Sequence, residues 1–401
     1  MPAGRHGPRS WRGAPIGKHA EERPTPVRLV GKPNAGPGSL RARGLAAMHR
    51  EKRLFARVID SANLSRAFRD ASAGKRDRPE VQEFEHHLET RLWELRREVE
   101  AGTYRWGAYR RFLIRDPKRR EIRAAPFRDR VLHHALFTVI DPLFARGYIT
   151  DTYACIRGRG THRAVRRYRE FVRARGGMGY ALQCDIQRYF ASVDHDILVG
   201  LLARRIGDAR LLTLLASLVG HGGDRPGIGM PIGNLTSQLF ANLYLDPFDH
   251  FVKETLRVRH YLRYMDDFIL LLDGRDEARA RLAQIEAFLQ ARLRLHLNPR
   301  RVVIAPVACA RDVLGYVHHL DGRTRIRRRS VRRLWRRLAV LDQRLAAGQI
   351  AWAFARASVA SWLGLASHAD AFRLSRAIFS VRDVRNVGKR LLVRGLGVWA
   401  R

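Results

Sequence analysis

The sequence predicts an α+β fold in which antiparallel strands are packed with helices. Residues 260–272 place two apolar, aromatic-rich runs on either side of the polar pair Asp266 and Asp267, which is the pattern of a strand, a tight turn and a returning strand. Residues 109–123 repeat this pattern around a second polar turn. Residues 79–101 instead carry apolar side chains at spacings of three and four, the period of an amphipathic helix. Hairpins and such helices in one chain are typical of α+β proteins.

The helix predicted over residues 79–101 begins and ends at suitable residues. Pro79 has the fixed φ that the first turn of a helix accepts, and Gly102 is suited to ending the helix. Asp194 is expected near the cap of a later helix, and Pro247 is expected to end another, because proline disfavours helix in the residue before it. The helices predicted in this part of the chain cover residues 195–206 and 209–219, a segment that starts at 234 or 236 and ends at 245, and residues 277–293.

The charge of the chain indicates a polyanionic partner. The 401 residues include 76 Lys and Arg but only 38 Asp and Glu, which gives a formal net charge of +38. So large a surplus repels itself in a compact state unless a polyanion lies nearby, and nucleic acid is the common one, with a membrane surface as the second candidate. No apolar run approaches the roughly 18 residues that span a bilayer, and the first residues lack the apolar core of a secretory signal. We therefore expect a cytoplasmic protein without membrane attachment.

Cysteines and histidines do not form a recognisable metal or disulfide pattern. The three cysteines, Cys155, Cys184 and Cys309, include no Cys-x-x-Cys pair. Adjacent histidines on a helix or strand point in different directions and are poor ligands for one metal ion. Neither a disulfide framework nor a structural zinc site is expected.

Three aspartates carry the most specific chemical signal. Asp266 and Asp267 are held close together on the predicted hairpin, and two ionised carboxylates at such a distance require a compensating cation, usually a divalent metal ion. By themselves they could be an acidic turn in an ordinary hairpin. Asp185, however, ends a strand predicted over residues 180–186. Carboxylates from separate strands can hold two metal ions that activate a hydroxyl and stabilise a leaving pyrophosphate.

Together with further motifs, these aspartates resemble the palm of a reverse transcriptase. The resemblance extends from about Leu54 to the C terminus, and four motifs follow one another in the order typical of the family. They are Asp185 with Phe190 five positions later, residues 231–238 (Pro-Ile-Gly-Asn-Leu-Thr-Ser-Gln), residues 264–267 (Tyr-Met-Asp-Asp) and residues 314–316 (Leu-Gly-Tyr).

The resemblance implies a right-hand polymerase with fingers, palm and thumb that makes DNA from an RNA template. The implied domains are a flexible basic arm (1–45), N-terminal helices and fingers (46–178), the palm with the primer-grip hairpin (179–320) and a basic helical thumb (321–401). It also implies two Mg²⁺ ions, held by Asp185, Ile186, Asp266 and Asp267, with the three aspartates as catalytic residues.

The same resemblance implies the residues that hold the incoming dNTP. Lys118 and Arg120 match the finger residues that bind the triphosphate, and Phe190 lies under the sugar, where its ring favours deoxynucleotides. The nucleotide-binding motif contributes Ile232, Gly233 and Gln238.

Contacts to the template RNA and to the RNA–cDNA duplex are implied as well. Arg157 and Arg159 lie in a template-contacting loop, and Arg301 takes the position near the pyrophosphate where many relatives have Lys. The primer-grip hairpin contains Gly315 and Tyr316. Residues 323–337 hold nine arginines and no acid around an apolar seam, which favours a thumb helix lying along a duplex, with Arg332 and Arg336 among its contacts.

The nucleotide-binding motif indicates the subtype. Most intron-type relatives read Gln-Gly-x-x-x-Ser-Pro there, whereas this chain has Ile232 for the first Gln and Gln238 for the final Pro. These changes resemble the reverse transcriptases of diversity-generating retroelements. That family implies error-prone copying of a template-repeat RNA, mutagenic retrohoming, and a basic oligomeric accessory-variability protein as partner.

Other interpretations remain open. A defence-associated, CRISPR-linked or group II intron-type reverse transcriptase has the same motifs. A non-catalytic RNA-binding scaffold is a candidate from another class, but a scaffold gains nothing from keeping three costly carboxylates.

Overall fold

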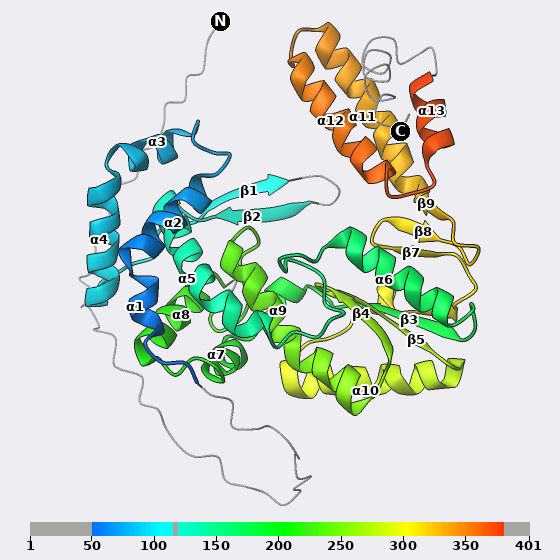
Figure 1. Cartoon of the computed structure of the whole chain (residues 1–401), viewed down its shortest axis with the longest axis horizontal. Helices are drawn as coiled ribbons and strands as arrows, with labels where there is room; N and C mark the ends of the chain where they lie inside the picture. Colours follow the sequence, from blue (N-terminus) through cyan, green and yellow to red (C-terminus); the bar gives the residue numbers. More distant parts are fainter. Residues whose placement is uncertain (1–49, 115–118, 224, 381–401) are drawn as a thin grey trace, which may run out of the picture. The chain divides into compact units, whose positions relative to one another are not determined.

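A four-stranded antiparallel sheet carries the acidic residues. This computed structural model describes residues 50–114, 119–223 and 225–380 (Figure 1). The strands are β3 (Tyr180–Asp185), β4 (His260–Tyr264), β5 (Asp267–Leu272) and β6 (Val303–Pro306), and they lie side by side in the order β4-β5-β3-β6. β4 and β5 pair antiparallel across a tight turn, which confirms the hairpin predicted over residues 260–272.

Helices and smaller sheets make up the other described elements. A two-stranded hairpin is formed by β1 (Arg110–Ile114) and β2 (Arg120–Ala124), and a three-stranded sheet by β7 (Arg311–Val313), β8 (Tyr316–His318) and β9 (Thr324–Ile326). The helices are α1 (Leu54–Val58), α2 (Ser61–Ser72), α3 (Pro79–His86), α4 (Leu88–Ala101), α5 (Phe127–Ala145), α6 (Thr161–Ala174), α7 (His195–Ala203), α8 (Ala209–His221), α9 (Leu235–His250), α10 (Arg275–Leu293), α11 (Arg328–Ala346), α12 (Trp352–Ala366) and α13 (Phe372–Ser380). Short helical turns are η1 (Tyr189–Ser192), η2 (Phe251–Thr255) and η3 (Pro299–Arg301).

β5 is buried on both faces, because helices cover the sheet from opposite sides. Leu270 packs into a core that also contains Leu289 of α10, whereas Ile269 and Leu271 pack into a second core with Tyr168 of α6. Figure 1 shows α6 and α10 on opposite faces of the sheet. Successive side chains of a strand point to opposite faces, so this double cover fixes the register of the strand that begins at Asp267.

The helix predicted over residues 79–101 is instead two helices, α3 and α4, separated at His87, whose backbone leaves helical geometry with φ −113° and ψ 33°. Phe84 of α3 packs its ring against Phe68 and Phe127, with ring centroids 5.9 and 5.2 Å apart. α4 packs against α2 and buries Leu95. The bend lets each half bury its own apolar residues against a different neighbour. The predicted stop at Gly102 is confirmed by its left-handed conformation.

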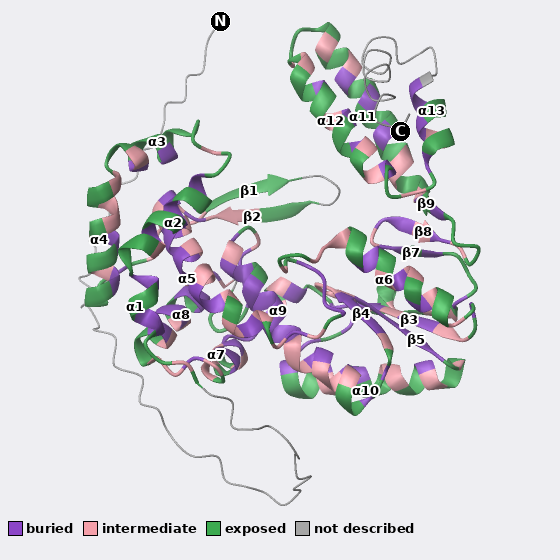
Figure 2. Cartoon of the chain, viewed as in Figure 1, coloured by how far each residue is buried: buried purple, intermediate pink, exposed green. Residues whose placement is uncertain are grey.

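The expectation that Pro247 ends a helix is wrong. α9 begins at Leu235, continues through Pro247 to His250 and is followed by the π-helical turn η2. Phe248 and Asp249, directly after the proline, are fully buried, so tertiary contacts outweigh the local preference. Figure 2 shows that α9 is buried along most of its length. The predicted cap of α7 is confirmed, since the Asp194 side chain accepts a hydrogen bond from the Ile197 N–H at 3.0 Å.

The arginine-rich region beginning at Arg323 first forms strand β9 and only then the long helix α11. α11, α12 and α13 share a core of their own, which contains Leu334, Leu338, Val359 and Trp362. Among the described residues, no helix is both long enough and apolar enough to cross a bilayer. The predicted arm (1–45), Lys118 and residues 381–401 lie outside the described residues, and the predicted domain boundaries stay predictions.

Hairpin β1–β2 is attached to the loop before α9 by a close backbone approach at Gly233. The Arg123 N–H of β2 donates to the Ile232 carbonyl at 2.9 Å. Gly233 has φ +127°, and a Cβ there would lie 3.0 Å from Cγ2 of Ile122 and 3.1 Å from the Arg123 carbonyl oxygen. Only glycine therefore fits this position without strain.

We expect Gly233→Ala to lower the free energy of unfolding by about 1 to 3 kcal/mol, because alanine adds both backbone strain and a close contact. Chemical denaturation measures this change. The matched control is Gly200→Ala, since no atom lies within 4 Å of the added Cβ in helix α7. Equal stability of the two variants would contradict this account.

Candidate active site

Asp185, Asp266 and Asp267 are brought to one end of the central sheet. Asp185 is the last residue of β3 and stands directly opposite Asp267, the first residue of β5. Asp266 lies in the β4–β5 turn, and its carbonyl accepts a hydrogen bond from the Ile186 N–H at 3.2 Å. Met265, which precedes the pair, has the left-handed φ of +59°. Strand register and turn geometry together place the three carboxylates next to one another.

Negative charge at this end of the sheet exceeds its local compensation. Asp185 is buried, and Asp266 and Asp267 are half-buried. Burial raises the pKa of Asp266, and the carboxylate of Asp185 acts in the same direction. Burial, followed by the carboxylate of Asp266, raises the pKa of Asp267. A bound cation would stabilise the ionised forms of these carboxylates, so the electrostatics of this end of the sheet favour cation binding.

Arg301 supplies part of the positive charge beside these carboxylates. Its Nη1 donates to Asp185 Oδ1 at 2.8 Å, and its Nη2 lies 3.6 Å from Asp267 Oδ1. Asn298, at the start of η3, donates from Nδ2 to Asp185 Oδ2 at 3.2 Å. The resemblance predicts Arg301 near a pyrophosphate, but nothing in the sequence indicates its pairing with Asp185. Asn298 is likewise not predicted as a site residue, although an Asn followed by Pro before two arginines marks a turn there.

The donor set fits a hard divalent cation. Mg²⁺ and Mn²⁺ prefer oxygen ligands such as carboxylates. The negative charges of the three aspartates also outnumber the positive charges beside them. Within the described parts of the chain, no three His, Cys, Asp or Glu residues stand as a ready-made metal site. Arg301 occupies the space between two of the aspartates instead. The Ile186 side chain is buried in the core, so only its backbone carbonyl could serve a metal ion.

Four of the predicted nucleotide-binding residues, Phe190, Ile232, Gly233 and Gln238, lie in η1, in the loop before α9 and on α9 itself. Phe190 of η1 is half-buried, and its carbonyl accepts from the Met230 N–H at 2.7 Å, which ties η1 to the loop that contains Ile232 and Gly233. Ile232 is half-buried, and Gln238 is exposed on α9.

A cleft of about 610 Å³ is lined by several of the residues that the sequence predicts to bind metal, nucleotide or nucleic acid. Its lining includes Arg120 of β2, Tyr264, Asp267, Arg301 and Gly315. The cleft thus brings together residues that are far apart in the sequence, from the β1–β2 hairpin to the β7–β8 hairpin. Its walls carry both acidic and basic side chains.

The predicted nucleic-acid contacts differ in what their side chains do. Arg157 is exposed, as are Arg332 and Arg336 on α11. Arg159 instead uses Nη1 to donate to the carbonyls of Ile149 and Thr152, at 2.6 and 2.7 Å, so it orders its own loop.

The predicted primer-grip residues form the tight connection between β7 and β8. Gly315 has φ +99°, which glycine adopts readily. Tyr316 is fully buried, and its hydroxyl donates to the Leu365 carbonyl at 3.0 Å. Its ring therefore supports the hairpin from inside, and only the backbone is left to face a ligand.

Residues 115–318 match the model of the reverse transcriptase (RNA-dependent DNA polymerase) family. This match covers half of the chain and all three aspartates, and the chain belongs to that family. It is an enzyme of the RNA-directed DNA polymerase class, whose members use divalent metal ions. The family and the α+β fold predicted from the sequence are confirmed.

Two curated relatives illustrate the similarity. Protein YkfC of Escherichia coli is 26% identical over 273 residues, which cover 57% of this chain and 71% of YkfC. The group II intron-encoded protein LtrA of Lactococcus lactis is 24% identical over 250 residues, which cover 58% of this chain and 41% of LtrA. The match thus spans less than half of LtrA.

The chain also matches parts of solved structures, at lower sequence identity. A chain of the Cas6-RT-Cas1–Cas2 complex is 21% identical with a TM-score of 0.37, and the match covers 59% of this chain and 42% of that one. A telomerase from Candida albicans is 12% identical with a TM-score of 0.40, over 55% of this chain and 45% of that one.

The excess of negative charge at Asp266 and Asp267 predicts how the stability of the protein depends on pH. A carboxyl whose pKa is raised on folding stabilises the protein while protonated, and this contribution is lost as pH rises through the raised pKa. In metal-free buffer at about pH 8, Asp267→Asn should therefore have a higher Tm than the wild type, and the difference should shrink towards about pH 5. The control is Asp276→Asn, whose carboxylate is 93% exposed. A destabilised Asp267→Asn protein at the higher pH would contradict this interpretation.

Proposed function

We propose that the chain synthesises DNA on an RNA template, with Asp185, Asp266 and Asp267 as catalytic residues that hold two Mg²⁺ ions. The observation that carries this proposal is the register of β3 and β5, which sets Asp185 opposite Asp267 with Asp266 in the adjoining turn. The raised pKa values of Asp266 and Asp267 support it, because they report unbalanced negative charge. Bound metal ions supply activation of the primer hydroxyl and charge stabilisation at the reacting phosphate.

Other residues of the cleft bind and orient the substrates. Arg120 and Arg301 face the same cleft as Asp267, and as fixed cations they attract the triphosphate of a dNTP. Arg301 does not give up its proton readily, so it binds phosphate without acting as a general acid. Phe190 borders the sugar. The exposed arginines of α11, Arg332 and Arg336, contact the backbone of the RNA–cDNA duplex.

Isosteric neutralisation of the aspartates tests this assignment. Asp185→Asn or Asp266→Asn should lower the rate of primer extension at least about 100-fold, because the charge of the ligands is required. Binding of primer–template, measured by fluorescence anisotropy, should persist. Asp312→Asn is the matched control, since Asp312 lines the same cleft but pairs with Arg327 at 3.3 Å. Extension at the wild-type rate by Asp266→Asn would refute the assignment.

For the biological role, we propose error-prone copying of a template-repeat RNA in a diversity-generating retroelement. The support is Ile232 and Gln238 in the nucleotide-binding motif, where intron-type relatives have Gln and Pro. A group II intron-type role is the second candidate, favoured by the similarity to LtrA. The proposed setting is the cytoplasm, with a basic oligomeric accessory-variability protein as partner. A template repeat and a variable repeat near the gene would separate the two roles.

Ile232 is expected to lower fidelity. A Gln amide at this position can hydrogen-bond near the nucleotide, whereas isoleucine has neither donor nor acceptor. One such bond is worth about 0.5 to 1.5 kcal/mol, so Ile232→Gln should reduce misincorporation roughly two- to tenfold. Sequencing of cDNA made on one template measures this. Ile228→Gln, at a 40% exposed position in the same loop, is the control. An active Ile232→Gln enzyme with an unchanged error rate would move the cause to Gln238.

A further inference from the structure

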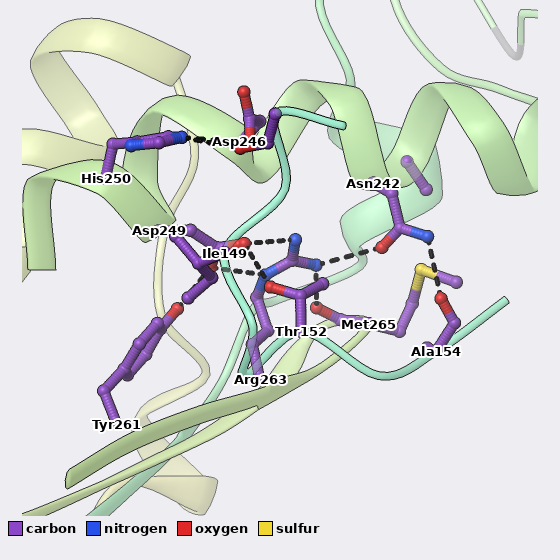
Figure 3. A network of polar contacts seen from close by, with 12 residues as sticks. Ile149, Thr152, Ala154, Asn242, Asp246, Asp249, His250, Tyr261, Arg263 and Met265 are labelled. Carbon is purple, nitrogen blue, oxygen red and sulfur yellow. Dashed lines mark hydrogen bonds and ion pairs between the residues drawn. The ribbon is translucent and has the colours of Figure 1, made fainter. Parts of the chain in front are cut away.

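A buried ion pair lies directly behind the turn that carries the aspartates. Arg263, near the end of β4, and Asp249, on α9, both have fully buried side chains. Figure 3 shows the contacts between them. Arg263 Nε donates to Asp249 Oδ1 and Nη2 donates to Asp249 Oδ2, each at 2.7 Å. This bidentate geometry uses one edge of the planar guanidinium and fixes its orientation. The orientation of the remaining nitrogen, Nη1, is thereby fixed as well.

Nη1 of Arg263 points toward the β4–β5 turn, which carries the proposed catalytic residues Asp266 and Asp267. Arg263 Nη1 donates to the Met265 carbonyl at 3.0 Å and lies 3.4 Å from the side-chain oxygen of Asn242. The Met265 carbonyl and the Asp266 nitrogen belong to one planar peptide group. A guanidinium that holds this carbonyl therefore sets the direction in which Asp266 leaves the turn. Figure 3 shows the Met265 carbonyl beside the guanidinium.

The turn has a conformation that requires such support. Met265 has φ +59°, a left-handed conformation that side chains with a Cβ disfavour. Strain of this kind persists where the surroundings determine the conformation. The hydrogen bond from Arg263 is one such determinant, and the bond from the Ile186 N–H to the Asp266 carbonyl is the other.

The ion pair also connects the turn to neighbouring segments. Asp249 accepts from the hydroxyls of Tyr261 and Thr152, at 2.6 and 2.7 Å, in addition to Arg263. Asn242, about two turns before Asp249 on the same face of α9, donates to the Ala154 carbonyl at 2.8 Å. α9 begins at Leu235, inside the nucleotide-binding motif of residues 231–238, and residues 152–154 lead into the loop of Arg157. The network thus joins the catalytic turn to both segments through one guanidinium.

We propose that Arg263 is a positioning residue for catalysis: by holding the Met265 carbonyl while anchored to Asp249, it sets Asp266 and Asp267 in the geometry that binds metal ions. This inference rests on the proposed role of the three aspartates. A purely structural ion pair would affect stability alone, whereas a positioning residue affects metal affinity and turnover in protein that is fully folded.

Arg263→Lys is the main test. A lysine keeps the charge, but its single ammonium group cannot span both oxygens of Asp249 and the Met265 carbonyl in one plane. Folded Arg263→Lys protein should bind primer–template as the wild type does, yet show a kcat lower by about 10- to 100-fold. Its affinity for Mn²⁺, measured by electron paramagnetic resonance with primer–template and without dNTP, should also fall.

The matched control is Arg167→Lys. Arg167 also pairs with a buried carboxylate, that of Asp151, at 2.9 Å, but the structure records no contact between its side chain and the turn. This variant should keep the wild-type kcat and Mn²⁺ affinity. If Arg263→Lys does not fold, Arg263→Gln combined with Asp249→Asn replaces it, because that pair leaves no unpaired buried charge. The same losses are expected.

The outcomes separate this inference from the proposed function. Wild-type kcat and Mn²⁺ affinity in folded Arg263→Lys, with a lowered Tm as the only change, would overturn the positioning role. If Mn²⁺ binding survives in Asp266→Asn and that variant extends primers normally, the assignment of the aspartates fails instead. Loss of Mn²⁺ binding in Asp266→Asn and weakened binding in Arg263→Lys would support both.

Discussion

Antiparallel pairing of β3 with β5 forces three carboxylates together, because it sets Asp185 opposite Asp267 while the tight turn keeps Asp266 beside them. Repulsion between like charges grows as the surroundings become less polar, and Asp185 is buried. The arrangement is stable only if neighbouring segments supply positive charge and hydrogen bonds at fixed places. The positions of η3, the β4–β5 turn and the β1–β2 hairpin can be understood from this requirement.

The compensation is incomplete on the side that faces the cleft. Arg301 and Asn298 reach Asp185, and Arg301 also approaches Asp267, but burial still raises the pKa of Asp267. Ionisable groups with raised pKa values in a cleft are typical of catalytic sites, because the unsatisfied charge is available to a ligand. In the function proposed above, that ligand is a metal ion bound together with a nucleotide.

Compensation is complete on the opposite side of the same turn. Asp249 receives hydrogen bonds from Arg263, Tyr261 and Thr152 and is fully buried with its partner. A buried ion pair contributes little net stability compared with apolar residues, but loss of one partner is costly. Such a pair is better suited to specifying one geometry than to adding stability. The β4–β5 turn therefore has the fully paired Arg263 and Asp249 on one side and the incompletely compensated aspartates on the other. Met265 lies between these two groups.

The sequence by itself determined the reverse transcriptase family, the hairpin around Asp266 and Asp267, the cap at Asp194 and the stop at Gly102, since these are recorded in short runs of residues. Local patterns failed where distant contacts decide: the bend at His87 follows from the packing of Phe84, and α9 continues past Pro247 because Phe248 and Asp249 are buried. The pairs Arg301 with Asp185 and Arg263 with Asp249 were equally invisible. Only the tertiary structure could reveal them, because a single charge in a sequence does not say which distant carboxylate it meets once β3, β4 and α9 have packed.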